Sequence, residues 1–476
     1  HHVFEEFEKA LSKTQYIVGQ NIGFDINIMG AEFYRYGVTT RMGELPVLDT
    51  CTEITAELCK IEGGKGGKFK YPSLTELHQF LFGAPFAEAH NATADVEATA
   101  RCFFELIRRG EGFSFEQLSQ ESMALIQEKY TTPVALWGLQ HINLKAASEK
   151  LKSKKEDTAL SSAQLAENLA LLEAAPFAHL HNHTQFSVLQ STASIADLVK
   201  ATGEGQMPAV ALTDHGNMMG AFQFIKEVSK YNKEAKAKNA KAQENGEPAP
   251  LPIIKPIIGC EFYICENHLD RSKKDNGYQV VFLAKDKEGY QNLIKMASIA
   301  YTKGFYYVPR IDKKIVEQYK KNIIVLSGNL YGEIPSKILN QGEKQAEEAL
   351  LWWKEQFQED FYIEIIRHGQ EDENRANAVL IQLAKKHGIK LVTTNNTYYI
   401  SSKDANAHDI LLCVKDGEKQ ATPIGHGRGF RYGLPNEEYY FKSSEQMKEL
   451  FKDIPQAILS IEEIINKIEQ QQKTMN

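Results

Sequence analysis

The stretch FAHLHNHTQFSVLQ, residues 177–190, places histidines at alternate positions: His179, His181 and His183. In an extended chain, alternate side chains point to the same face of the strand. Three imidazoles on one face are a donor set that suits a transition metal. The stretch is therefore a candidate metal-binding strand, and the question is whether a metal is held there.

Short apolar runs alternate with helical patterns along the rest of the chain beyond residue 177. Repeated strand–helix units predict parallel pairing, and about seven such units favour a closed barrel over a short open sheet. We therefore expect an α/β fold with a (β/α)7 barrel in this part. The predicted strands are FAHLHNH, AVALTDH, PIIGCEFYI, QVVFLAKD, NIIVLSGN, FYIEIIRH and KLVTTNN.

Composition limits the classes of protein that need to be considered. The 476 residues suffice for roughly three domains, and 42% hydrophobic with 25% charged residues is typical of a globular protein. A formal net charge of −7 gives no general attraction to nucleic acid, so any contact with DNA must come from local patches. The six cysteines form no CxxC pair, which favours reduced thiols and a cytoplasmic location. No apolar run approaches the length of a membrane span.

Two motifs near the N-terminus combine carboxylates with a histidine. NIGFD, residues 21–25, follows an apolar strand and opens a helix, and HNATAD, residues 90–95, opens another helix. These motifs resemble the second and third motifs of the DEDDh 3′–5′ exonucleases, the epsilon-type proofreading family. The resemblance implies that Asp25 and Asp95 hold Mg²⁺ or Mn²⁺ and that His90 is the general base.

The family's first motif, an Asp-x-Glu on the opening strand, has no counterpart upstream of residue 21. We therefore expect a partial ribonuclease H-like fold in this part of the chain. Without these two carboxylates the metal pair would lose half of its anionic ligands, so the chain as given is expected to be an inactive exonuclease. The plain structural alternative is that Asp25 only caps a helix.

Nearly all of residues 177–476 resemble the PHP (polymerase and histidinol phosphatase) region of bacterial DNA polymerase III alpha subunits. The whole arrangement resembles alpha subunits with a fused proofreading nuclease, and the catalytic aspartates of their palm domain would lie beyond residue 476. The resemblance is carried by FAHLHNHTQFSVL, MPAVALTDHGNMMGAFQF, IKPIIGCEFYI, LAKDKEGYQNLIKMASIAYTKGFYYVPRID, IVLSGNLYGEIP and DANAHDILLCVKDG.

The resemblance implies a metal centre at the mouth of the barrel, where His181, His183, His215 and Glu261 occupy ligand positions. Other ligand positions of the family hold neutral residues in this chain, and neutral amides and phenols are weak ligands for transition metals. We therefore expect a metal-depleted, structural PHP domain, and we do not expect Zn²⁺ to be held there. The departing residues are Gln190, Gln279, Asn329, Asn396 and Tyr398.

The predicted division is an exonuclease domain without its first motif (1–110), a helical and extended linker (111–176), the PHP domain (177–440) and the lead-in to the polymerase palm (441–476). The resemblance implies a DNA-directed DNA polymerase with a 3′–5′ exonuclease, acting in DNA replication on a primer–template. A sliding clamp and other replisome subunits are its expected partners, and QHINL (140–144) is a weak candidate clamp motif. A non-catalytic replisome scaffold and a metal-dependent PHP phosphoesterase are the alternatives.

Overall fold

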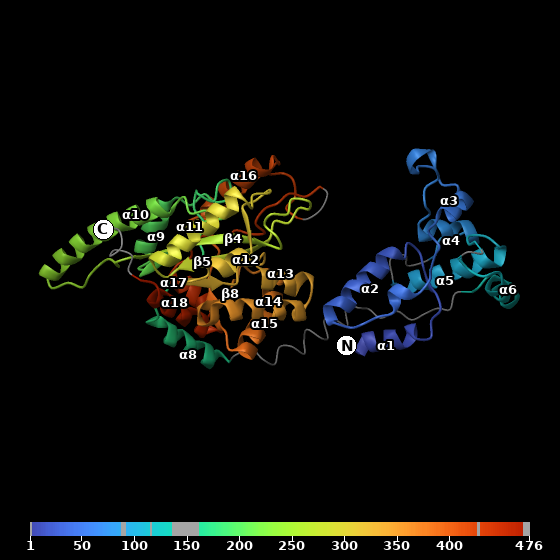
Figure 1. The fold of residues 1–476 in the computed structure, drawn as a ribbon, viewed down its shortest axis with the longest axis horizontal. Helices are drawn as coiled ribbons and strands as arrows, with labels where there is room; N and C mark the ends of the chain where they lie inside the picture. Colours follow the sequence, from blue (N-terminus) through green and yellow to red (C-terminus); the bar gives the residue numbers. More distant parts are fainter. Residues whose placement is uncertain (1, 87–91, 115–116, 136–160, 426–428, 470–476) are drawn as a thin grey trace. The chain divides into compact units, whose positions relative to one another are not determined.

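The computed structural model describes residues 2–86, 92–114, 117–135, 161–425 and 429–469, which form two compact units, 1–159 and 160–476 (Figure 1). The predicted base His90 and the QHINL segment lie outside the described residues. Within the ranges that are described, no helix is both long enough and apolar enough to cross a membrane.

The first unit contains a small parallel sheet of two strands, β1 and β2, with Ile17 opposite Val47. Helix α5 contacts β1 and buries Cys102, Leu106 and Ile107. A ribonuclease H-like fold for this unit remains a prediction. The elements are α1 (His2–Leu11), β1 (Ile17–Gly19), α2 (Gly23–Tyr36), β2 (Val47–Asp49), α3 (Glu53–Cys59), α4 (Leu74–Phe82), α5 (Ala92–Arg109) and α6 (Gln120–Lys129).

The second unit is built on a seven-stranded sheet in the order β3-β4-β5-β7-β8-β9, with β6 paired to β4. Its helices are α8 (Ser162–Glu173), α9 (Ile195–Glu204), α10 (Ala221–Glu244), α11 (Lys287–Thr302), α12 (Lys313–Tyr319), α13 (Glu333–Asn340), α14 (Glu343–Phe357), α15 (Glu371–His387), α16 (Ala405–Asp416), α17 (Ser444–Leu450) and α18 (Pro455–Lys467). Its strands are β3 (Ala209–Leu212), β4 (Lys255–Cys265), β5 (Tyr278–Ala284), β6 (Arg310–Asp312), β7 (Ile323–Leu326), β8 (Phe361–Ile365) and β9 (Lys390–Thr393).

The expectation of parallel pairing throughout is wrong at β5, which runs antiparallel to both β4 and β7. Parallel neighbours need a crossover, usually a helix, but residues 266–277 between β4 and β5 contain no helix. The other neighbours, β3–β4, β4–β6, β7–β8 and β8–β9, are parallel, as predicted.

The predicted first strand, residues 177–183, is extended but contributes only an isolated bridge, between Asn182 and Thr397. Its backbone nevertheless bonds on both sides. The amide of Ala211 in β3 donates to the carbonyl of His179 (2.9 Å), and the amide of Thr397, beyond β9, donates to the carbonyl of His181 (3.1 Å). The segment therefore fills the gap between β3 and β9 and curls the sheet toward a barrel.

The core of this unit is a continuous cluster of buried apolar side chains between the sheet and its helices. Trp353 on α14 is buried against Phe282 of β5 and Phe357, and so packs this helix onto the sheet. These contacts fix the strands whose ends carry the polar side chains described next.

Candidate metal centre

Three of the predicted ligands converge on a fourth, Glu261, inside the curled sheet. His183 Nε2 lies 2.9 Å from Glu261 Oε2, His215 Nδ1 lies 2.6 Å from the same oxygen, and His181 Nε2 lies 3.3 Å from Oε1. All four side chains are buried. The structure therefore brings together every metal ligand that the resemblance implied for the barrel.

Backbone geometry near β3 and β4 explains this convergence. His215 follows β3 and bridges to Glu261 in β4. The next residue, Gly216, has a φ of +64° and donates its amide to the carbonyl of Glu261 at 2.8 Å. A side chain at this left-handed position would be strained, so the glycine in TDHG holds the turn that aims His215 at the carboxylate.

His179 does not join this group. Its Nε2 lies 2.8 Å from the carbonyl oxygen of Lys442, and its ring packs against Phe177 and Phe441. Burial, opposed by that hydrogen bond, lowers the pKa of His179 to about 4. The alternating spacing thus sends two histidines, not three, to the carboxylate.

A second buried carboxylate, Glu364 of β8, escaped prediction. Its Oε1 lies 2.7 Å from His181 Nδ1, and its Oε2 accepts the amide of Gly328 at 3.0 Å. The signal in the sequence was a single charged residue within the apolar run FYIEII. A buried charge is rarely left without a partner, which makes such a glutamate a candidate for a functional or structural ion pair.

The two carboxylates set the charge of His181. Burial alone disfavours the imidazolium, but Glu364 and Glu261 outweigh it and raise the pKa of His181 to about 10. His183 behaves oppositely, because burial and the neighbouring His215 lower its pKa to about 3. Burial would raise the pKa of Glu261, but His215 and His181 hold it well below its ordinary value. The surroundings of His181 therefore favour its protonated form, and those of His183 favour its neutral form.

The geometry fits one metal ion. Donor atoms of His181, His183 and Glu261 all lie within 4.8 Å of one another. His181 Nε2 and His215 Nδ1 lie close to Glu261 but lack the alignment of a hydrogen bond, so both nitrogens are buried without a hydrogen-bond partner. A metal-binding histidine ordinarily bonds a carboxylate through its other nitrogen, as His181 Nδ1 bonds Glu364. Imidazoles with one carboxylate form a donor set typical of Zn²⁺ sites.

Hydrogen-bonding side chains occupy the positions where the resemblance implies further ligands. Asn329 Nδ2 lies 3.2 Å from Glu261 Oε1 and 3.0 Å from Gln279 Oε1. Tyr398 Oη lies 3.2 Å from His215 Nε2, and its ring stacks on His183 at 4.3 Å. Asn329 is therefore a hydrogen-bond donor to Glu261 at a position where the resemblance implies a metal ligand.

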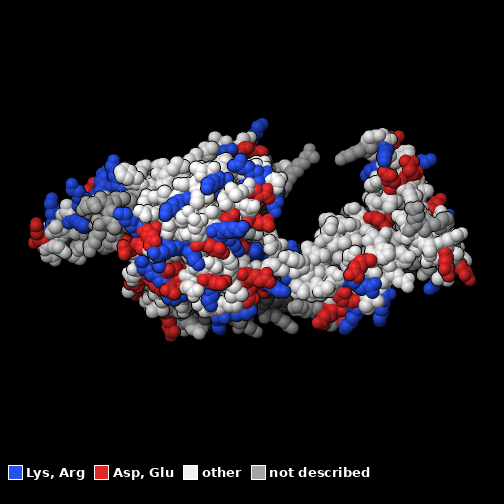
Figure 2. Space-filling model, in the orientation of Figure 1, with Lys and Arg blue, Asp and Glu red and all other residues white. Residues whose placement is uncertain are grey.

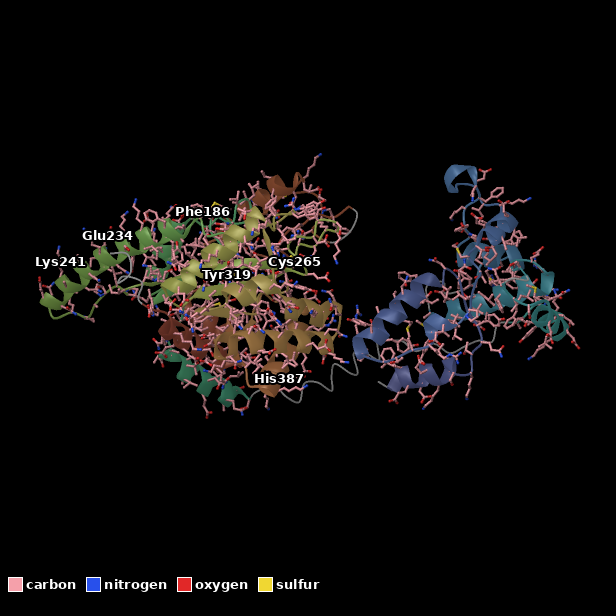
Figure 3. All side chains as sticks on the ribbon, in the orientation of Figure 1. Phe186, Glu234, Lys241, Cys265, Tyr319 and His387 are labelled. Atoms are coloured by element: carbon pink, nitrogen blue, oxygen red, sulfur yellow. The ribbon has the colours of Figure 1, made fainter. Side chains whose placement is uncertain are left out.

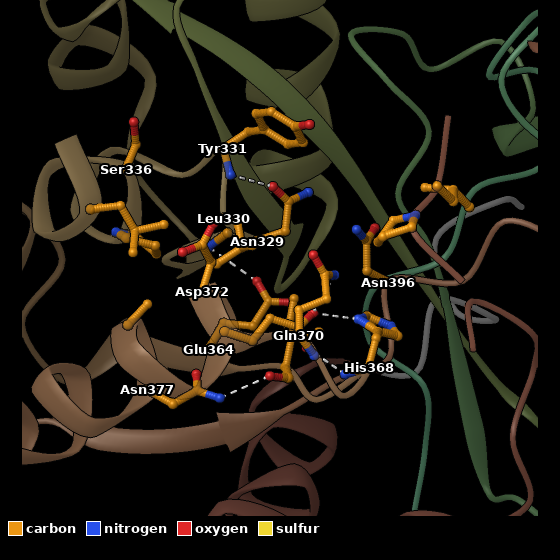
Figure 4. A pocket seen from close by; sticks show the side chains of 18 of the residues that line it. Asn329, Leu330, Tyr331, Ser336, Glu364, His368, Gln370, Asp372, Asn377 and Asn396 are labelled. Atoms are coloured by element: carbon orange, nitrogen blue, oxygen red, sulfur yellow. Dashed lines mark hydrogen bonds and ion pairs between the residues drawn. The ribbon is translucent and has the colours of Figure 1, made fainter. Parts of the chain in front are cut away.

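A cavity of about 500 Å³ adjoins these residues and is lined by Asn329, Glu364, Asn396 and Tyr398, among others (Figure 4). The Oδ1 atom of Asn396 is buried without a hydrogen-bond partner, and the residue has a φ of +47°. His368 also lines the cavity, but its two nitrogens contact Glu373 (2.6 Å) and the carbonyl oxygen of Asn395 (2.8 Å). Both ring nitrogens of His368 therefore have partners within the core.

The predicted exonuclease residues lie in the first unit. Asp25 is exposed in the first turn of α2, and Asp95 is half-buried in the first turn of α5. Within the described ranges, no cluster of three potential metal ligands forms around them. A carboxylate that the sequence did not single out, Asp49, accepts the amides of Asn21 (2.8 Å) and Ile22 (3.1 Å) and so fixes the turn that leads to Asp25.

Comparisons with known proteins find a family and relatives that match this chain. Residues 179–368 match the PHP domain family. The chain is 36% identical to the DNA polymerase III subunit alpha of Borreliella burgdorferi, over 59% of this chain and 23% of that protein. It is 37% identical to the Campylobacter jejuni subunit, over 61% and 23%, and 38% identical to the Thermus aquaticus subunit, over 62% and 22%.

The chain thus spans less than a quarter of the length of these relatives. Among solved structures, an amidohydrolase from Chromobacterium violaceum aligns with 46% of this chain and 87% of its own length, at 10% identity and a TM-score of 0.29, which is too low to support an argument. The second unit contains a PHP domain, and this domain is homologous to the corresponding region of DNA polymerase III alpha subunits.

Proposed function

We propose that this chain is the N-terminal part of a replicative DNA polymerase III alpha subunit, and that its PHP domain is a scaffold rather than a hydrolase. The observation that carries the scaffold role is the contact between Asn329 Nδ2 and Glu261 Oε1. At a position where the resemblance implies a metal ligand, Asn329 instead donates a hydrogen bond to Glu261. The polymerase assignment is supported by the shared region with alpha subunits.

The chemistry of the centre supports this role. Enzymes that hydrolyse phosphate esters with two metals use them to stabilise the attacking and the leaving oxygen. The described residues offer donors for one ion, namely His181, His183 and Glu261, with His215 beside them. A single divalent ion there would neutralise Glu261 and tie the segment 177–183 to β4, which is a structural contribution.

A phosphatase assay on the full chain tests the proposal. We expect no hydrolysis of p-nitrophenyl phosphate or pyrophosphate after loading with Zn²⁺, Mn²⁺ or Mg²⁺. Activity that is lost in His183→Ala but kept in a surface control, Lys344→Gln, would contradict the scaffold role. It would instead favour the second candidate, a metal-dependent phosphoesterase, which the converging imidazoles and the adjoining cavity would serve.

For the first unit we propose the fold and descent of a 3′–5′ proofreading exonuclease. Asp25 and Asp95 would hold Mg²⁺ or Mn²⁺ and His90 would be the base, acting on a DNA primer end. Within the described residues no group of three potential metal ligands forms around Asp25 and Asp95, so we expect this chain not to digest a mispaired primer end. Digestion that requires Mg²⁺ and is abolished by Asp95→Ala would contradict this expectation. A sliding clamp and other replisome subunits are the proposed partners.

A further inference from the structure

Helix α10 forms an arm that extends beyond the other elements of the second unit (Figure 1). Its 24 residues correspond to a length of about 36 Å. Phe224 and Val228 anchor its first half in the core of the unit. Residues 245–254 then return along the second half toward β4.

Two asparagines clamp the arm to the returning segment. Asn232 donates to the carbonyl of Ile254 and accepts its amide, both at 2.8 Å. Two helical turns further on, Asn239 donates to the carbonyl of Leu251 (2.8 Å) and accepts its amide (3.1 Å). A helix that only solubilised the surface would gain little from paired side-chain clamps, so these contacts indicate an arm that is held rigid.

A stripe of lysines runs along the face of α10 opposite the clamps. Successive helical residues are rotated by about 100°, which places four exposed lysines within an arc of about 80°. The buried residues Phe224, Val228, Ala235 and Ala242 lie on the opposite side. The lysines of this basic stripe are Lys226, Lys230, Lys233 and Lys241.

The charge of the arm is not compensated locally. α10 carries six lysines and three glutamates, in a chain whose net charge is −7. None of the six lysines has an ion pair with a described residue, whereas Lys313, Lys337 and Lys390 elsewhere in this unit each pair with a glutamate. Basic side chains gather along the arm in Figure 2, and Glu234 and Lys241 mark its outer part in Figure 3.

We propose that the basic stripe of α10 binds the phosphate backbone of duplex DNA. From Lys226 to Lys241 the stripe spans about 22 Å, roughly two thirds of a turn of duplex. No aromatic residue lies on this face between the two lysines, so the stripe lacks the stacking platforms that single strands require. The inference rests on the proposed function only for the choice of duplex DNA over another polyanion.

Salt dependence of DNA binding tests the inference on the full 476-residue chain, with EDTA present so that no strand is cut. The variant changes Lys226, Lys230, Lys233 and Lys241 to Gln. The logarithm of the binding constant falls with the logarithm of the salt concentration by about 0.9 per neutralised phosphate. We therefore expect the slope for a labelled 30-base-pair duplex to become shallower by about 3 to 4 units.

The matched control changes Lys314, Lys344, Lys385 and Lys403 to Gln, which removes the same charge from exposed lysines elsewhere in the unit. An equal change of slope in the control, an unchanged slope in the arm variant, or no binding by the wild type would overturn the inference. Stronger arm-dependent binding to poly-glutamate than to duplex DNA would also overturn it, in favour of an acidic protein partner.

A second variant separates rigidity from charge. Asn239→Ala keeps every lysine but removes one clamp, and we expect it to weaken binding to the duplex several-fold while the salt slope changes by less than about 1 unit. Unchanged affinity would overturn the role given to the clamp. The phosphatase assay and this binding assay fail independently, since DNA binding by the arm requires no property of the metal centre.

Discussion

The two sides of the centre around Glu261 differ in the chemistry of the side chains that face the carboxylate. On one side lie His181, His183 and His215, which can bind a metal, and on the other lie Asn329 and Gln279, which hydrogen-bond to each other. The three histidines and Asn329 are buried, whereas Gln279 is half-buried. Asn329 and Gln279 keep a polar network beside Glu261 without adding a charged metal ligand, because amides can both donate and accept hydrogen bonds.

The largest expected effect comes from the residue that both sides share. Glu261→Gln keeps the shape but removes the charge that faces His181, and breaking a buried ion pair typically costs 3–5 kcal/mol. We expect the free energy of unfolding of the second unit to fall by about 3 kcal/mol, measured by urea denaturation followed by tryptophan fluorescence. Glu348→Gln, on the exposed face of α14, is the control, and a loss below about 1 kcal/mol would show that the cluster is not held by this charge.

Placing metal ligands at Asn329 and Gln279 tests whether these two amides alone prevent the binding of a further metal ion. The double variant Gln279→His/Asn329→His places two imidazoles beside Glu261. We expect Zn²⁺ to stabilise it by about 2.7 kcal/mol more than the wild type when free Zn²⁺ is about 100 times the dissociation constant of the new site. The same stabilisation in Asn374→His, an exposed position on α15, would indicate nonspecific binding instead.

Asn329→Ala tests how much the amide hydrogen bonds stabilise the second unit. It leaves Glu261 Oε1 and Gln279 Oε1 without the amide donor, and an unsatisfied buried acceptor costs about 1–3 kcal/mol. We expect urea denaturation to report a loss of about 1–2 kcal/mol in the presence of EDTA. An unchanged stability would mean that the amide network does not substitute for the metal.

The smallest expected effect is a shift in the pH at which the second unit begins to lose stability in alkaline solution. Because the pKa of His181 is raised to about 10, its contribution is fully present below the unfolded value of about 6.5 and is lost as the pH rises toward 10. Glu364→Gln removes one of the two carboxylates that raise this pKa. We therefore expect the alkaline loss of stability, measured in EDTA, to begin at a lower pH in the variant than in the wild type, and a later onset would contradict the charge assigned to His181.

Much of the second unit could be predicted from the sequence. The predicted run AVALTDH contains β3, and the resemblance identified three histidines and the glutamate at which they meet. The direction of strand pairing could not be predicted from periodicity, because an apolar strand such as β5 has the same hydrophobic pattern in a parallel or an antiparallel pair. The loop between β4 and β5, which lacks a crossover helix, was the available signal.

Two features of the centre depend on long-range contacts. Glu364 meets His181 across 183 positions of sequence, and only the sheet order brings β8, the neighbour of β9, within reach of the segment 177–183. His179 shares the spacing of His181 and His183, but its acceptor is the carbonyl of Lys442, far along the chain. Spacing predicts which residues share a face in an ideal strand, but it does not predict where the strand stops being regular.

Metal stoichiometry of the intact chain tests the central claim most directly. Elemental analysis after loading with Zn²⁺ and removal of free ion should find no more than one Zn²⁺ per chain, and this ion should be lost in His183→Ala. Two or three tightly held Zn²⁺ ions per chain in the wild type, which keeps Asn329 and Gln279, would contradict the claim that amides have replaced the remaining ligands.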